Sequence, residues 1–209
     1  VNIFQGRRQI IATEIERVEE SEVDLDEFVV RTGNNPEEMY AELLGHVEAL
    51  DDVYIKDLLK AILEDTEISR RLKIWQAGKS IHHAYQGGLL EHILSCIKLA
   101  LSLSSHYDVN ANYVVAGAIL HDLGKIYELT DGINVDYTEE GKLVGHLIKA
   151  VEIIDRFAYR IQNFPHQVRT HIKHIVLSHH GDYEYGSPKL PQTSEAYLVH
   201  MIDVMDSRM

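Results

Sequence analysis

Residues 114–125 read VVAGAILHDLGK, seven small or apolar residues followed directly by His121 and Asp122. A helix of this composition, predicted over residues 110–122, has no polar face and must be buried. Its end therefore places an imidazole and a carboxylate in the protein interior, where polar groups without partners cost several kcal/mol. A metal ion would satisfy both groups, because imidazole and carboxylate are ligands that Mn, Fe, Co and Zn accept.

Ligand-type residues recur in other apolar segments. The segments are LLEH, GKLVGHLIKAVEII, HIVLSHH and HMIDV, which together with the stretch above make five predicted helices. A single buried histidine is more often a hydrogen-bonded core residue than a ligand. Five apolar helices that each carry a ligand-type residue, however, need a common explanation. We therefore predict a metal site with seven ligands: His92, His121, Asp122, His146, His179, His180 and Asp203. Cys96 is interpreted as a packed core thiol, since no other cysteine is present.

Length and composition are those of a globular chain with one good core. The 209 residues are 45% hydrophobic, and no run of 18 uncharged apolar residues occurs, so we expect no membrane association. No signal peptide is recognisable, and a single cysteine fits a reducing compartment, which predicts a cytoplasmic protein. Because the chain begins with Val1, we interpret it as a fragment of a longer protein.

The net charge of −13 argues at first against a nucleic acid partner. However, residues 12–70 hold 18 acidic and five basic residues, and this segment alone accounts for the whole excess. The remainder of the chain is neutral, and metal ions would neutralise the carboxylates of the predicted site. The site region can therefore accept a phosphate.

The chain divides into three predicted parts. Residues 1–22 include RQIIATEIERV (8–18), a β-branched stretch that predicts a strand and the remnant of an upstream β domain. Residues 23–35 are acidic and predict a linker. A helix begins at Asn35-Pro36, and residues 36–209 are predicted to be all-α. The later helical patterns cover residues 53–64, 66–76, 87–105, 110–122, 139–161, 165–180 and 194–208.

Three segments around the predicted ligands indicate a substrate surface. Lys125 follows Asp122 by three residues, which places its ammonium on the same side if the turn continues. His82, His83 and Tyr85 directly precede the helix that carries His92. Tyr183 and Tyr185 follow the second histidine pair and are predicted to stack bases. A solvated lysine and two tyrosines that only cover a loop are the alternative interpretation.

Longer phrases carry a family resemblance. They are HHAYQGGLLEH (82–92), HDLGKIYEL (121–129), GKLVGH (141–146), LSHHGDYEYGSPKLP (177–191) and EAYLVHMIDVMD (195–206). The ligand series resembles the HD superfamily of metal-dependent phosphohydrolases, and the phrases are most similar to the bacterial YhaM-type 3′→5′ exoribonucleases. The resemblance implies a helical HD-domain bundle, preceded by an OB-type nucleic-acid-binding domain of which residues 1–22 would be the end.

The resemblance also implies roles for individual residues. One metal ion would take His92, His121, Asp122 and Asp203, and a second would take Asp122, His146, His179 and His180. Asp122 would then bridge two divalent ions (Mn, Fe, Co or Zn), and Asp122 and Lys125 would be the catalytic residues. The flanking residues alone, without the resemblance, predict the substrate-binding set His82, His83, Tyr85, Lys125, Tyr183 and Tyr185.

Three functions follow as hypotheses. The first is a 3′→5′ exonuclease that releases mononucleotides from single-stranded RNA; a wider form of this hypothesis includes DNA as a substrate. The second is a phosphohydrolase of small nucleotides or cyclic nucleotides. The third is a non-catalytic regulatory module with a metal site. The sequence leaves the oligomeric state open, a homo-oligomer included.

Overall fold

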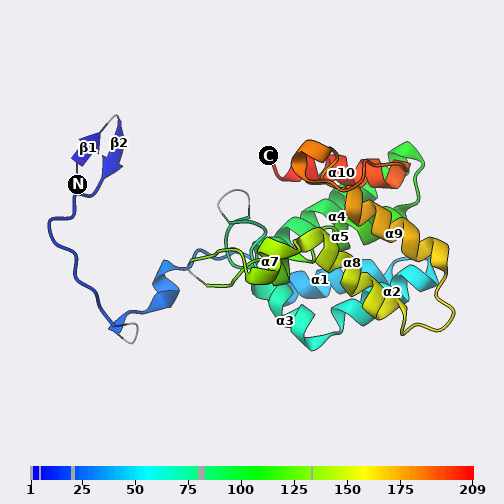
Figure 1. Ribbon diagram of the computed structural model, residues 1–209, viewed down its shortest axis with the longest axis horizontal. Coiled ribbons are helices and arrows are strands. Elements are labelled where there is room, and N and C mark those ends of the chain that lie inside the picture. Colours follow the sequence, from blue (N-terminus) through cyan, green and yellow to red (C-terminus); the bar gives the residue numbers. More distant parts are fainter. Residues whose placement is uncertain (1, 5, 20–21, 80–82, 133) are drawn as a thin grey trace.

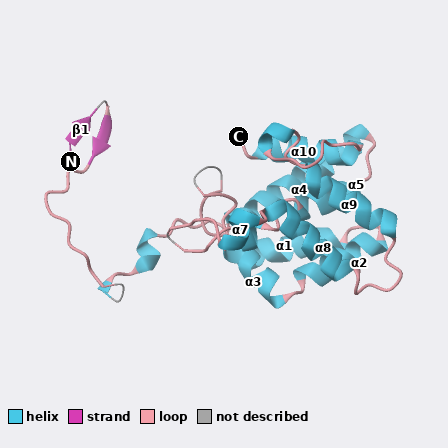
Figure 2. Ribbon diagram, in the orientation of Figure 1, coloured by secondary structure: helices cyan, strands magenta, loops and turns pink. Residues whose placement is uncertain are grey.

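The computed structural model describes residues 2–4, 6–19, 22–79, 83–132 and 134–209. Helices dominate the described chain, which confirms the predicted all-α class (Figures 1 and 2). The α-helices are α1 (Pro36–Glu48), α2 (Val53–Leu63), α3 (Thr66–Ile74), α4 (Gly88–Tyr107), α5 (Ala111–Leu120), α6 (Lys125–Glu128), α7 (Glu139–Leu143), α8 (His146–Ala158), α9 (His166–Ser178) and α10 (Ser194–Asp206).

The N-terminal segment forms only a small hairpin. Strand β1 (Asn2–Phe4) pairs antiparallel with β2 (Arg7–Gln9), and residues 10–19 have no regular structure. The predicted strand over residues 8–18 is therefore wrong beyond residue 9. Ile10, Ile11 and Ile15 are exposed, because no further strand of the described chain pairs with them or covers them. Figure 1 shows the hairpin apart from the helical body.

The end of the segment predicted as a linker is attached to the helical body. A 3-10 helix covers Leu25–Phe28. After it, the backbone pairs with Gln86 on both sides: Gln86 N donates to Val30 O at 2.9 Å, and Thr32 N donates to Gln86 O at 2.9 Å. The Thr32 hydroxyl also donates to Glu91 Oε2 at 2.7 Å. These bonds hold residues 30–32 against the start of α4, next to the predicted site.

Helix α4 runs through the middle of the bundle and contacts α5, α10, α1 and α3. Its buried face consists of leucine, isoleucine and alanine, and α5 beside it is buried almost throughout. Among the helices of the described ranges, α4 is the one that is long and apolar enough to cross a membrane by length and hydropathy alone. Of its apolar 18-residue stretch, 56% is buried inside the protein. Core helices of soluble proteins have the same property.

Most predicted helices occur within two residues of their predicted ends. Asn35 caps α1 by accepting from Glu37 N at 2.9 Å, as the Asn-Pro pair predicted. The single helix predicted over residues 139–161 is wrong, because the chain forms two helices, α7 and α8. Gly145 lies between them with φ +80°, a conformation that ends one helix and lets the next begin at His146. His146 is therefore the first residue of its helix.

Candidate metal centre

Five helices deliver the seven predicted ligands to one place. The residues lie within α4 (His92), after α5 (His121 and Asp122), at the start of α8 (His146), after α9 (His179 and His180) and within α10 (Asp203). All except His180 and Asp203 are buried, and those two are half-buried. The structure thus brings together every residue of the predicted ligand series.

Two clusters form within this group. The first consists of His92, His121, Asp122 and Asp203, and the second of His146, His179 and His180; within each cluster the potential ligand atoms lie within 4.8 Å of one another. The rings of His121 and His179 connect the clusters, with centroids 4.9 Å apart. The site can therefore hold two ions side by side.

Asp122 faces both clusters with different oxygens. Its Oδ2 lies 3.7 Å from His92 Nε2 and 3.6 Å from His121 Nε2. Its Oδ1 lies 3.6 Å from His146 Nε2 and 3.7 Å from His179 Nε2. A carboxylate in this position has one oxygen for each cluster, which is the geometry expected of a bridging ligand.

Three of the five histidines donate from Nδ1 to backbone carbonyls. The pairs are His121 to Ala118 O at 3.1 Å, His179 to Val176 O at 2.8 Å, and His180 to Tyr185 O at 2.9 Å. A carbonyl oxygen only accepts, so the proton of each ring resides on Nδ1. Each Nε2 is then an unprotonated lone pair, and this is how metal-ligating histidines are oriented.

The other two histidines donate from Nδ1 to carboxylates. His92 pairs with Asp206 Oδ2 at 2.7 Å, and His146 pairs with Glu128 Oε1 at 2.9 Å. Although burial opposes it, hydrogen bonds from His83, His92 and Ser95 hold the pKa of Asp206 far below its usual range. Glu128 has a lowered pKa as well, because its bonds to His146 outweigh its burial. Both carboxylates are therefore ionised acceptors, and they orient the two imidazoles.

The Nε2 atoms need a cation. The Nε2 atoms of His92 and His121 lie 3.1 Å apart, and His146 Nε2 is buried without any hydrogen-bond partner among the described residues. Lone pairs that face one another in this way repel unless a positive charge lies between them. The residues present therefore fit divalent metal ions, which imidazole and carboxylate ligands bind.

The pKa values of the histidines agree with this interpretation. Burial lowers the pKa of His121 to about 4, and burial together with His179 and His146 lowers that of His180 to about 4. The pKa of His92 is raised, because the hydrogen bond to Asp206 and the charge of Asp122 outweigh burial. The rings of His121 and His180 thus stay neutral at pH 7, while the carboxylates attract positive charge to the site.

Lys125 lies directly beside the proposed bridging carboxylate. Its Nζ is 2.6 Å from Asp122 Oδ2, at the first residue of α6, so the two side chains share a side as predicted. Burial opposes its charge, but Asp122 and Asp203 raise the pKa of Lys125, and the ammonium remains charged. Cys96 lies 3.7 Å from His92 Nε2, and burial raises the pKa of its thiol, which favours the protonated form expected of a packed core thiol.

The predicted substrate residues have different outcomes. His82 lies outside the described residues. His83 contacts the site, with Nε2 3.3 Å from Asp206 Oδ2 and Nδ1 2.9 Å from the Tyr85 hydroxyl. Tyr183 and Tyr185 are exposed on the 3-10 helix Tyr183–Tyr185, and only Tyr185 lines the cavity that adjoins the site. These binding roles remain predictions.

Sequence reasoning missed two residues that orient ligands. Asp206 accepts from His92, His83 and Ser95, and Glu128 accepts from both the backbone and the ring of His146. The spacing carried a signal for each. Asp206 follows Asp203 by three residues on α10, and Glu128 ends the short helix that Lys125 begins, so both share a side with a predicted site residue.

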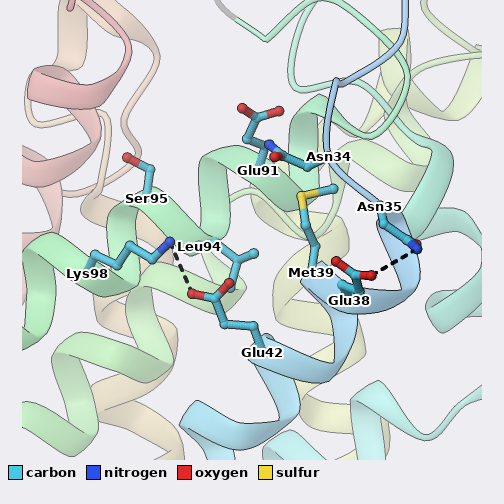
Figure 3. Close-up of a pocket in the computed structure, with 9 residues that line it drawn as sticks. All are labelled: Asn34, Asn35, Glu38, Met39, Glu42, Glu91, Leu94, Ser95 and Lys98. Atoms are coloured by element: carbon cyan, nitrogen blue, oxygen red, sulfur yellow. Dashed lines mark hydrogen bonds and ion pairs between the residues drawn. The ribbon is translucent and has the colours of Figure 1, made fainter.

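A second pocket, of about 370 Å³, lies between α1 and α4 (Figure 3). Glu91, Ser95 and Lys98 of α4 face Glu38 and Glu42 of α1 across it, together with Asn34, Asn35, Met39 and Leu94. Lys98 is paired with Glu42 at 3.0 Å. Three carboxylates with one neutralised lysine repel phosphate groups, so this pocket is unsuited to a nucleic acid chain.

Comparison with known families identifies the domain. The HD domain matches residues 89–208, which include all seven clustered residues. The chain belongs to the HD domain family. Together with the relatives below, this match supports a metal-dependent phosphohydrolase and confirms the resemblance found in the sequence.

Curated relatives extend the similarity beyond the HD domain. The chain is 34% identical over 206 residues to a protein of Listeria welshimeri named 3′-5′ exoribonuclease YhaM, covering 98% of this chain and 65% of the relative. It is 33% identical over 211 residues to the protein of the same name from Oceanobacillus iheyensis, covering 100% of this chain and 66% of the relative. The chain thus spans just under two thirds of the length of these relatives. No solved structure matches it.

Proposed function

We propose that this chain is a metal-dependent phosphodiesterase that acts as a 3′→5′ exonuclease on single-stranded RNA and releases mononucleotides. The main observation is that five imidazoles lie in two adjacent clusters and that Asp122 faces both with different oxygens. The name of the relatives supports RNA as the substrate. A cytoplasmic location belongs to this proposal, since Cys96 is a free, buried thiol.

The residues of the two clusters would divide the work. His92, His121, Asp122 and Asp203 would hold one divalent ion, and Asp122, His146, His179 and His180 would hold a second. The ions would supply an activated water and polarise the phosphodiester. Asp206 and Glu128 keep the ligand rings in the required tautomer. Lys125 places a fixed positive charge beside the reacting phosphoryl oxygens. In the hydrolysis, the water oxygen bonds to phosphorus, the bond to the upstream ribose 3′-oxygen breaks, and that oxygen takes a proton.

A small-nucleotide phosphohydrolase is the second candidate. The net charge of −13 disfavours long polyanions and favours it. The RNA proposal accommodates the charge because the acidic excess lies in residues 12–70, whereas the clustered residues all lie between residues 92 and 203.

The proposal is tested with RNA labelled at its 5′ end. With Mn²⁺ present, we expect a short single-stranded RNA to shrink progressively from its 3′ end with release of mononucleotides, as seen on a denaturing gel. A circular RNA of the same sequence offers no end and should stay intact. Hydrolysis of cyclic nucleotides or nucleoside phosphates with intact RNA would instead support the second candidate. No turnover of any substrate would leave a regulatory module.

Lys125→Ala should lower kcat roughly 10²–10³-fold, the usual loss for one group that stabilises transition-state charge. The metal content should stay unchanged, because Lys125 contacts Asp122 and is not a ligand. Steady-state kinetics and elemental analysis measure the two effects. Lys79→Ala is the matched control, since Lys79 pairs with Asp136 at 2.9 Å on the surface, and its kcat should equal that of the wild type. A rise in KM alone would show that Lys125 binds the ground state only.

A further inference from the structure

A cavity of about 430 Å³ adjoins the metal centre. His180 of one cluster and Asp203 of the other both line it, so it borders the two clusters together. Its volume lies in the range of roughly 300–1,000 Å³ that small-molecule sites occupy. A phosphate held between the clusters would therefore have this cavity beside it, with room for one attached nucleoside.

Tyr185 supplies an aromatic surface in this cavity. Its side chain is 61% exposed, although its backbone is well anchored. The Tyr185 carbonyl accepts from His180 Nδ1 at 2.9 Å, and the following Ser187 is buried and donates to Leu177 O at 3.1 Å. The loop is thus tied both to a candidate ligand and to α9. An exposed aromatic ring on an anchored loop is the arrangement that stacks nucleobases.

Arg208 supplies positive charge to the same cavity. It is the one lysine or arginine among the described residues that line the cavity, and its side chain is exposed. Lys125, in contrast, is engaged with Asp122. A guanidinium binds phosphate oxygens through two parallel N–H donors, and the lining also contains the carboxylates of Asp182 and Asp203. Asp182 can accept from ribose hydroxyls.

We propose that this cavity binds the 3′-terminal nucleotide of the substrate, with its base stacked on Tyr185 and Arg208 contacting phosphate oxygens. This inference rests on the proposed exonuclease function and names the subsite that such an enzyme requires. Because the cavity holds one nucleotide, cleavage at the adjacent phosphate releases products one nucleotide long. Nucleotide specificity should be low, since stacking on an aromatic ring is tolerant of the base.

The subsite is tested by equilibrium binding of adenosine 5′-monophosphate, measured by isothermal titration calorimetry on the protein as purified. Tyr185→Ala should weaken binding roughly 5- to 150-fold, the range for loss of one stacked base, whereas Tyr185→Phe should bind like the wild type. Arg208→Ala should weaken binding about tenfold. The control is Tyr159→Ala. Tyr159 is also exposed, but it lies just after the C-terminal end of α8, whereas His146 begins that helix.

Inorganic phosphate serves as a second probe. Its affinity should not change in Tyr185→Ala, because phosphate has no base to stack. Unchanged affinity for adenosine 5′-monophosphate in both the Tyr185 and Arg208 variants would overturn the subsite, even if the wild type shortens RNA. Tyr185-dependent binding without RNA hydrolysis would support the subsite and reject the exonuclease. The two proposals can therefore fail separately.

Discussion

Replacement of Asp122 by Ala should remove metal from both clusters and abolish phosphodiester hydrolysis. Its Oδ2 faces His92 and His121, and its Oδ1 faces His146, so no other described side chain reaches both groups in the same way. We expect about one to two divalent ions per wild-type chain, two being full occupancy of a two-metal site, and close to none in the variant. Elemental analysis of the purified proteins measures this directly.

The same substitution should also destabilise the fold. Lys125 would keep a half-buried ammonium without its partner at 2.6 Å, and removal of one member of a buried ion pair costs about 3–5 kcal/mol. Asp136→Ala is the matched control, because Asp136 pairs with Lys79 on the surface and its loss should lower the free energy of unfolding far less than Asp122→Ala does. Chemical denaturation of the three proteins compares these free energies of unfolding.

A second variant separates metal binding from folding. Asp122→Asn keeps the size of the side chain and one oxygen but loses the charge, so it should fold more stably than Asp122→Ala while still binding less metal. Metal content equal to that of the wild type in both variants would exclude the bridging role. Loss of one ion with retention of the other would assign Asp122 to a single cluster.

The sequence was sufficient to predict which histidines and aspartates cluster, because each of them has a local signature. An imidazole or carboxylate at the end of an apolar helix, such as His121 after VVAGAIL, conflicts with burial unless something binds it. That conflict is visible without any tertiary information. The same reasoning explains why most helices around these residues were predicted close to their observed positions; the exception is the helix of His146, where one predicted helix is two.

For the groups that orient the ligands, the spacing indicates only a shared helix side, and their hydrogen-bond partners could not be predicted from the sequence. Asp206 and His92 are separated by 114 residues in the chain, and their hydrogen bond depends on how α10 packs against α4. An aspartate that lies on the surface and an aspartate that accepts a buried hydrogen bond cannot be distinguished in a sequence. The strand predicted over residues 8–18 failed for a related reason, since β-branched residues form a strand only where a partner strand exists.

Gly124 shows how tightly the site depends on close packing. It has an ordinary backbone conformation, with φ −62°, so its role is not a turn that only glycine can adopt. A Cβ atom built at this position would lie 2.8 Å from the carbonyl carbon of His146 and 2.9 Å from its Cα, and closer still to the carbonyl oxygen. The absence of a side chain therefore lets the start of α6 contact the first residue of α8.

Gly124→Ala should consequently force the two backbones apart, because backbone atoms cannot rotate away as a flexible side chain can. We expect a loss of about 3 kcal/mol or more, at the upper end for overpacked sites, and a fall in Tm of roughly 6–12 °C. Displacement of His146 should also reduce the metal content. Gly45→Ala is the control, since nothing lies within 4 Å of a Cβ at Gly45 within α1, and alanine there should raise stability by about 1 kcal/mol. Equal melting temperatures for Gly124→Ala and the wild type would show that α6 and α8 can separate freely, and His146 would then owe its position to Glu128 alone.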